Sequence, residues 1–148
     1  MAAVEAIVIS ACLAGILDIS ATGAIMTAQG TPLKRLLQFV ASGALGASAF
    51  DGGKKTAGVG LLFHFLIAGI AAAIYYAISR IFPVTLAHPV PFGVLYGMTV
   101  HLVMSRVVVP FSRAPKREFS LKAFLTQLVI HVFCVGLPIS LTQSYLFR

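Results

Sequence analysis

Apolar residues fill four long stretches of the chain, and short polar stretches separate them. The apolar stretches cover about residues 2–28, 56–82, 90–111 and 121–147. Each reaches the roughly 20 residues that an α-helix needs to cross the hydrocarbon core of a bilayer. The pattern therefore predicts an all-α integral membrane protein with four transmembrane helices.

A fifth apolar run, LLQFVASGALGASAF (Leu36 to Phe50), follows the first long stretch. It has about 15 residues, which is too short to span a bilayer and typical of an interfacial or re-entrant helix. Lysine and arginine bracket it, as expected of a helix near anionic headgroups. We therefore expect an interfacial or re-entrant helix over about 32–50, with a polar loop as the alternative. The bracketing residues are Lys34, Arg35, Lys54 and Lys55.

The composition agrees with this picture. The chain has 148 residues, of which 59% are hydrophobic and 10% are charged. A soluble domain carries about 25% charged residues to solvate its surface, so lipid is the expected surroundings of this chain. Its length suits one transmembrane domain over residues 1–148. The net charge of +7 could indicate nucleic acid, but the cations cluster in two loops, so we expect no nucleic-acid partner.

The distribution of these cations predicts an orientation. The loops after the first and third spans are strongly basic, whereas the opposite side has only Arg80 and Arg148. The positive-inside rule places the basic loops in the cytoplasm and both termini on the periplasmic or extracellular side. The cations of the basic side are Lys34, Arg35, Lys54, Lys55, Arg113, Lys116, Arg117 and Lys122.

One aspartate or histidine lies inside each span. Counted at 1.5 Å per residue from the basic side, all of them fall roughly 12–15 Å deep. Ionisable residues are costly in a membrane, so they are expected to face the bundle interior or a wet cavity. Polar neighbours at helical spacing support an inward face, and Thr22 is placed to hydrogen-bond the carboxylate four residues before it. The layer comprises Asp18, His64, His101 and His131, with Thr22, Ser105 and Gln127 as supporting polar residues.

Three interpretations of this layer stay open. Neutral histidines could form a structural network with Asp18 across the helices. Aspartate and histidine are also the usual parts of a path for protons or a small solute. Finally, three imidazoles and one carboxylate suit a transition metal, and two histidines on facing helices suit haem iron.

Enzymatic chemistry has little support. The sequence contains no GxSxG motif, no P-loop and no paired carboxylates. His101 and Ser105, four residues apart, could form a dyad, but helix geometry alone is a weak indication. We therefore favour a non-enzymatic protein.

The last three spans resemble the YagU-like family of small bacterial inner-membrane proteins. The resemblance rests on His64 in LLFHFLIAGI followed by IFP, on His101 in GVLYGMTVHLVMSRVVVPF, and on His131 in LTQLVIHVFCVGLP. It covers about residues 58–138 and does not include Asp18. It implies a four-helix protein of the bacterial inner membrane, and no particular reaction.

Small residues raise the question of partner chains. Gly93 and Gly97 form a GxxxG pair, and small residues recur between Ser42 and Ser48. Such surfaces let helices approach closely. They suit a homo-oligomer, or an accessory subunit of a larger membrane complex.

Overall fold

The computed structural model describes residues 3–147, and every regular element among them is helical. Four helices are long and apolar enough to cross a membrane: Ala3–Ala28, Gly53–Ile81, Pro89–Phe111 and Leu121–Phe147. This confirms the predicted helical class with four candidate spans. Ala3–Ala28 is α1 and Gly53–Ile81 is α3. The third span comprises α5 (Pro89–Val103), η2 (Met104–Val108) and α6 (Val109–Phe111), and the fourth comprises α7 (Leu121–Ile130), η3 (His131–Gly136) and α8 (Leu137–Phe147).

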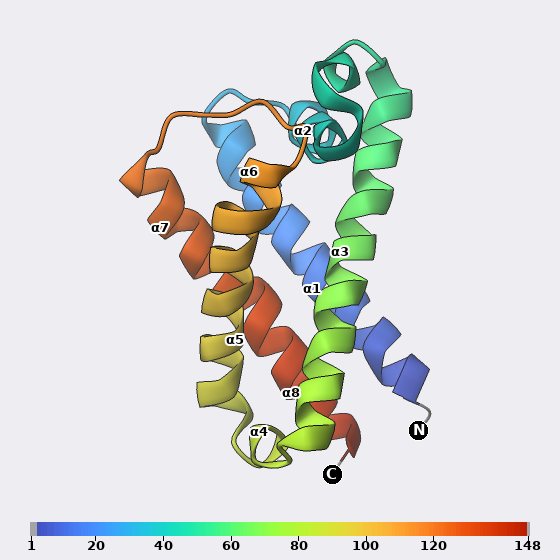
Figure 1. Ribbon diagram of the computed structural model, residues 1–148, viewed down its shortest axis with the longest axis vertical. Helices are drawn as coiled ribbons and strands as arrows, with labels where there is room; N and C mark the ends of the chain where they lie inside the picture. Colours follow the sequence, from blue (N-terminus) through green and yellow to red (C-terminus); the bar gives the residue numbers. More distant parts are fainter. Residues whose placement is uncertain (1–2, 148) are drawn as a thin grey trace.

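The four candidate spans form one bundle with two different ends (Figure 1). α2 (Leu33–Leu45), the helical turn η1 (Gly46–Phe50) and the loop of residues 112–120 lie at one end. The short helix α4 (Val84–Ala87), which the sequence did not predict, lies at the other end beside both chain termini. The two strongly basic segments are therefore at the same end, opposite the termini.

The outer surface of the bundle is apolar. Large hydrophobic side chains on every long helix are exposed, including Val4 at 70%, Leu62 at 67% and Phe133 at 64%. The interior, by contrast, is built largely from alanine, glycine and serine. Without a hydrophobic drive between helices in lipid, small residues that allow close backbone approach are the expected interior. The pattern suits a bundle surrounded by lipid chains.

The expected short helix after the first span is present, so the alternative of a polar loop is wrong. α2 continues into η1, and both pack against α3. Gln38, which is 1% exposed, donates from Nε2 to the carbonyl oxygen of Gly53 at 3.1 Å. Gly60 of α3 lies directly against the backbone of Leu37, where a Cβ would overlap the carbonyl. These contacts fix α2 across one end of the bundle.

Two candidate spans contain a π-helical segment, and each segment lies just before a proline. η2 precedes Pro110 and η3 precedes Pro138. Proline has no backbone N–H and its ring clashes with the carbonyl four residues back, so the regular hydrogen-bond ladder cannot continue there. A wider turn re-satisfies the freed groups, as is common in membrane helices.

The GxxxG pair is used inside the chain. Gly93 and Gly97 of α5 face Gly136, which lies against both of their backbones. A Cβ on Gly97 would also come within 2.6 Å of Val132 Cα. The close-packing signal therefore describes how α5 meets the fourth span, and it no longer supports a partner chain at this surface.

Gly136→Ala should destabilise the bundle because its methyl group would press on the backbones of Gly93 and Gly97. We expect a loss of about 1–3 kcal/mol, the usual cost of overpacking. Reversible unfolding in detergent micelles, followed by circular dichroism, measures it. Gly69→Ala in α3 is the control, since nothing lies within 4 Å of a Cβ there. Equal stability of the two variants would contradict the close contact.

Candidate functional site

A cavity of about 340 Å³ lies among the candidate spans, and it gathers the polar side chains that interrupt them. α1, α3, α5 and the fourth span all contribute to its walls. At one end its lining includes Phe39 and Gly43 of α2, together with Ser112 and Ala114 beyond α6. All the site residues named from the sequence line it: Asp18, Thr22, His64, His101, Ser105, Gln127 and His131.

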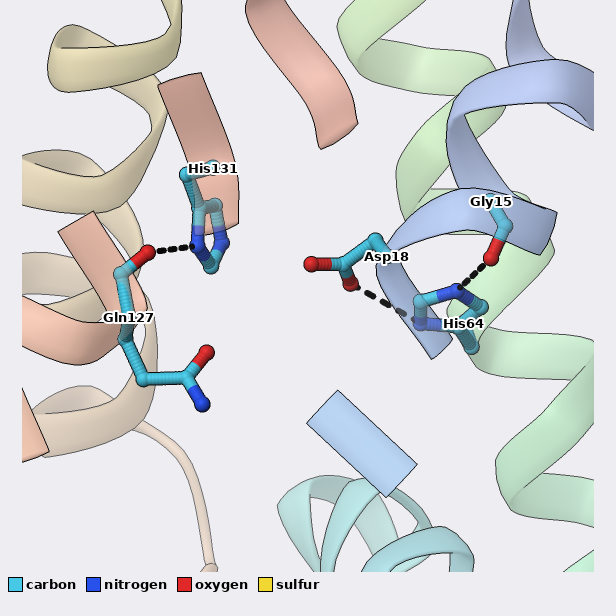
Figure 2. A network of polar contacts seen from close by, with 5 residues as sticks. All are labelled: Gly15, Asp18, His64, Gln127 and His131. Atoms are coloured by element: carbon cyan, nitrogen blue, oxygen red, sulfur yellow. Dashed lines mark hydrogen bonds and ion pairs between the residues drawn. The ribbon is translucent and has the colours of Figure 1, made fainter. Parts of the chain in front are cut away.

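Asp18 and His64 form one wall of the cavity. His64 Nδ1 lies 3.9 Å from Asp18 Oδ2, and His64 Nε2 lies 2.9 Å from the carbonyl oxygen of Gly15 (Figure 2). Both side chains are mostly buried, with 13% and 16% of their area exposed. Gly15 also allows α1 to lie close to α3, because a Cβ there would come within 2.7 Å of the Phe65 ring.

The contact with Gly15 determines where His64 carries a proton. A carbonyl oxygen only accepts hydrogen bonds, so Nε2 must be the protonated nitrogen. In a neutral imidazole, Nδ1 would then direct its lone pair at the Asp18 carboxylate. One extra proton, on Nδ1 or on the carboxyl group, removes this repulsion. At 3.9 Å the two atoms are beyond direct hydrogen-bond distance, so a bridging water also fits between them.

His101 and His131 form a second pair, whose ring centroids are 5.1 Å apart. His131 Nδ1 lies 2.8 Å from the carbonyl oxygen of Gln127, one turn earlier, and therefore donates to it. The His101 ring is 4% exposed and packs on Phe124 with a centroid distance of 4.6 Å. In Figure 2, His131 lies on the side of the space opposite Asp18 and His64.

Three polar atoms on the cavity walls are buried and lack a hydrogen-bond partner among the described residues. They are Asp18 Oδ1, Thr22 Oγ1 and His101 Nε2. The predicted hydrogen bond between Thr22 and Asp18 is therefore wrong, although both line the cavity. Buried polar groups are almost always satisfied by protein, water or ligand. A fourth such atom, Gln143 Oε1, belongs to a residue outside the cavity lining.

The polar residues that follow His101 along its helix contact other groups. Ser105 Oγ donates to the carbonyl of Leu102 in its own helix at 3.4 Å, and it makes no hydrogen bond to His101. Arg106 lies over the rings of Phe119 and Phe124. His101 and Ser105 therefore do not form a dyad, although their spacing would place them on one helical face.

A transition-metal site finds limited support in this geometry. Among residues 3–147, no group of three or more histidine, cysteine, aspartate or glutamate side chains could hold a metal ion. The four ionisable residues form two separate pairs instead of one cluster. Each pair offers at most two ligands, fewer than the three or four protein ligands of typical zinc sites.

A second polar cluster, which the sequence analysis missed, lies toward the α4 end. Gln143 is fully buried, and its Nε2 donates to Ser10 Oγ at 3.2 Å and to the carbonyl of Ala72 at 2.9 Å. Tyr75 and Ser140 share a hydrogen bond of 2.7 Å. Gln143 and Ser140, three residues apart on one helical face, were a readable signal of this cluster.

Tyrosine rings separate this second cluster from the cavity. The hydroxyl of Tyr96 donates to the carbonyl of Ala71, a cavity-lining residue, at 2.6 Å. The rings of Tyr96 and Tyr75 meet edge to face at 4.9 Å. Tyr75 in turn donates to the carbonyl of Thr85 in α4. The bundle is therefore packed tightly toward α4, while the cavity extends toward α2.

Comparison with known proteins adds no relative: no model of a known protein family, no curated protein and no solved structure matches the chain. The resemblance to the YagU-like family thus stays a prediction.

Gln143→Leu should lower the stability of the bundle because it removes hydrogen bonds that join α8 to α1 and α3. At about 0.6 kcal/mol per interhelical hydrogen bond, the expected loss is roughly 1 kcal/mol. Unfolding in detergent micelles measures it. Gln127→Leu is the matched control, since no hydrogen bond of the Gln127 side chain occurs among the described residues. A loss equal to that of the control would contradict a structural role for Gln143.

Proposed function

We propose that this chain is a multi-pass protein of the bacterial cytoplasmic membrane whose Asp/His layer handles protons or a small solute. The observation that carries the proposal is the meeting of Asp18, His64, His101 and His131 on the walls of one cavity. Ionisable residues within apolar spans commonly mark ion and substrate pathways.

Proton exchange is supported by the chemistry of the two pairs. The Asp18–His64 pair has room for one shared proton beyond the Nε2 proton held by Gly15. On the opposite side, His131 donates from Nδ1, which leaves its Nε2 able to accept a proton in the neutral form. Histidine is the side chain whose ordinary titration lies between pH 5 and 8.

Solute binding is supported by the size of the cavity. Its 340 Å³ is near the lower end of the roughly 300–1,000 Å³ typical of ligand pockets. At about 30 Å³ per molecule, the same space would hold on the order of ten waters. Apolar walls with a few convergent polar atoms are also typical of small-molecule sites. A hydrated cavity that admits a small, partly polar solute fits both features.

Two other functions are less well supported. A histidine-ligated transition metal would need more converging ligands than either pair supplies. Haem needs only one or two axial histidines, and it stays an alternative to the proposal. A structural accessory subunit remains compatible with the apolar outer surface, but the GxxxG pair is already occupied within the chain. An oligomer or a larger complex would therefore have to use other surfaces, such as the small residues between Ser42 and Ser48.

The proposed orientation places α2 and the 112–120 loop on the cytoplasmic side. The support is the concentration of cations at that end together with the positive-inside rule. Both chain ends lie at the opposite end and would face the periplasm.

Lys116→Cys and His88→Cys test this orientation, because both side chains are exposed and lie at opposite ends of the bundle. With Cys12 and Cys134 replaced by alanine, a membrane-impermeant thiol reagent added to intact cells with a permeabilised outer membrane should label His88→Cys and spare Lys116→Cys. Inverted membrane vesicles should give the reverse pattern. Labelling with the two patterns exchanged would overturn the orientation.

His101→Leu should abolish proton movement through the protein, because it removes a buried imidazole from the cavity wall. Protein reconstituted in liposomes with an internal pH-sensitive dye measures the rate under an imposed pH gradient. General acid–base groups contribute about 100-fold or more to proton-transfer rates, so flux should fall to that of empty liposomes. His88→Leu, outside the cavity, should behave like the wild type.

Asp18→Asn keeps this experiment decisive if His101→Leu fails to fold. It preserves the shape of the side chain while removing its charge. Loss of flux in a folded Asp18→Asn protein supports a proton path through the layer. Wild-type flux no higher than that of empty liposomes, or full flux in both variants, rejects proton handling, and unfolding of both variants indicates a structural network.

A further inference from the structure

We propose that a pocket between α2 and the 112–120 loop binds the phosphate of an anionic phospholipid through Arg35 and Arg117. Arg35 belongs to the first turn of α2, and Arg117 lies in the loop that follows α6. The two side chains line the same surface pocket together with Thr31 and Phe50. This site is separate from the cavity and does not depend on its proposed function.

Both guanidinium groups are held in place by aromatic rings. The Arg35 guanidinium carbon lies 4.8 Å from the centroid of the Phe50 ring, and that of Arg117 lies 4.5 Å from the Phe39 ring. A stacked guanidinium keeps its N–H groups free at the edge of the plane. Stacking therefore orients both arginines without using their hydrogen-bond donors.

The loop that carries Arg117 is tied to α2. The backbone N–H of Arg113 donates to the carbonyl oxygen of Gly43 at 2.9 Å. Ala114 of the same loop is 8% exposed. Together with the stacking on Phe39 of α2, these contacts bring Arg117 to Arg35 from a segment far along the sequence. The fold therefore brings Arg35 and Arg117 together, although they are far apart in the sequence.

The pocket contains positive charge and no carboxylate. None of its lining residues is acidic, and among residues 3–147 neither guanidinium has a carboxylate oxygen within 4.0 Å. Two like charges that share a pocket repel one another, so an anion between them would lower the energy. Thr31 adds a hydroxyl donor at the same place.

A phosphodiester of a lipid headgroup fits these features. Phosphate oxygens accept paired N–H bonds from arginine, which is the residue best suited to such recognition. The pocket lies at the end of the bundle where the candidate spans stop, which is the level of the headgroups. Leu33, next to the pocket in α2, is 45% exposed and suits contact with an acyl chain. Arginine and lysine at the cytoplasmic surface attract anionic lipids in general, but a stacked pair adds a defined site.

Native mass spectrometry of the full-length protein in mild detergent tests the site by titration with phosphatidylglycerol. Phosphatidylglycerol should bind about tenfold or more tightly than phosphatidylcholine. Arg35→Gln/Arg117→Gln should weaken phosphatidylglycerol binding by about tenfold or more, the effect of losing charge-assisted hydrogen bonds. Lys54→Gln/Lys55→Gln is the matched control: it removes the same charge at the same end, from residues outside the pocket, and should leave the affinity unchanged.

Arg35→Lys/Arg117→Lys separates recognition by paired N–H groups from simple charge attraction. It retains both charges and should still lose most of the selectivity, since lysine lacks the planar fork. If Arg35→Gln/Arg117→Gln does not fold, this lysine variant still tests whether the two arginines bind the lipid phosphate. Equal weakening in the Lys54/Lys55 control would overturn the proposal in favour of diffuse attraction.

A competition experiment identifies the source of the phosphate. Inorganic phosphate should not displace bound phosphatidylglycerol at equal concentrations, because the lipid also gains contacts for its acyl chains. Displacement at equal concentrations would assign the pocket to a free phosphate-type anion and overturn the lipid assignment. Equal affinity for phosphatidylglycerol and phosphatidylcholine would overturn the site altogether.

Discussion

Polar groups inside a bundle whose outer surface is apolar must find their partners within the protein, and this constraint organises the structure. Lipid tails offer no hydrogen bonds, so unsatisfied groups cost several kcal/mol each, by an order-of-magnitude estimate. The chain meets the constraint in two ways. Toward α4, Gln143 Nε2, Ser10 and Ser140 donate to one another or to nearby carbonyls, although Gln143 Oε1 has no partner among the described residues. Toward α2, Asp18 and the histidines surround a cavity in which some polar atoms have no protein partner.

Backbone geometry makes this division possible. The close approach of Gly136 to Gly93 and Gly97 joins the third and fourth spans without large side chains between them. Pro110 and Pro138 then force π-helical segments, which place Ser105 and His131 on the cavity wall. π-helical turns often occur at functional sites because they redirect side chains within an otherwise regular helix. The same residues that loosen these helices thus shape the walls of the cavity.

Much of this architecture could be predicted from the sequence, because it depends on local patterns. The lengths of the apolar runs predicted the four candidate spans, and helical spacing predicted that Asp18 and the three histidines would face inward. What local patterns could not predict was pairing across helices. His64 meets Asp18 across the contact between α1 and α3, with its Nε2 on the Gly15 carbonyl, and the Thr22–Asp18 bond expected from spacing does not form. The GxxxG pair was recognisable, but its partner Gly136 was not, since the motif is equally compatible with an internal or external contact.

Phe39 connects the cavity with the basic surface. Its ring lines the cavity and also stacks under the guanidinium of Arg117. A force on Arg117 from a headgroup phosphate would therefore act on a residue of the cavity wall, whereas the α4 end is held by the Tyr75–Tyr96 contact. α2 is fixed to α3 by Gln38 and by the close contact at Gly60, and the 112–120 loop is tied to α2 through the Arg113–Gly43 hydrogen bond. The cavity lining reaches α2 and this loop and includes no residue of α4, so any opening of the cavity to water should occur beside α2.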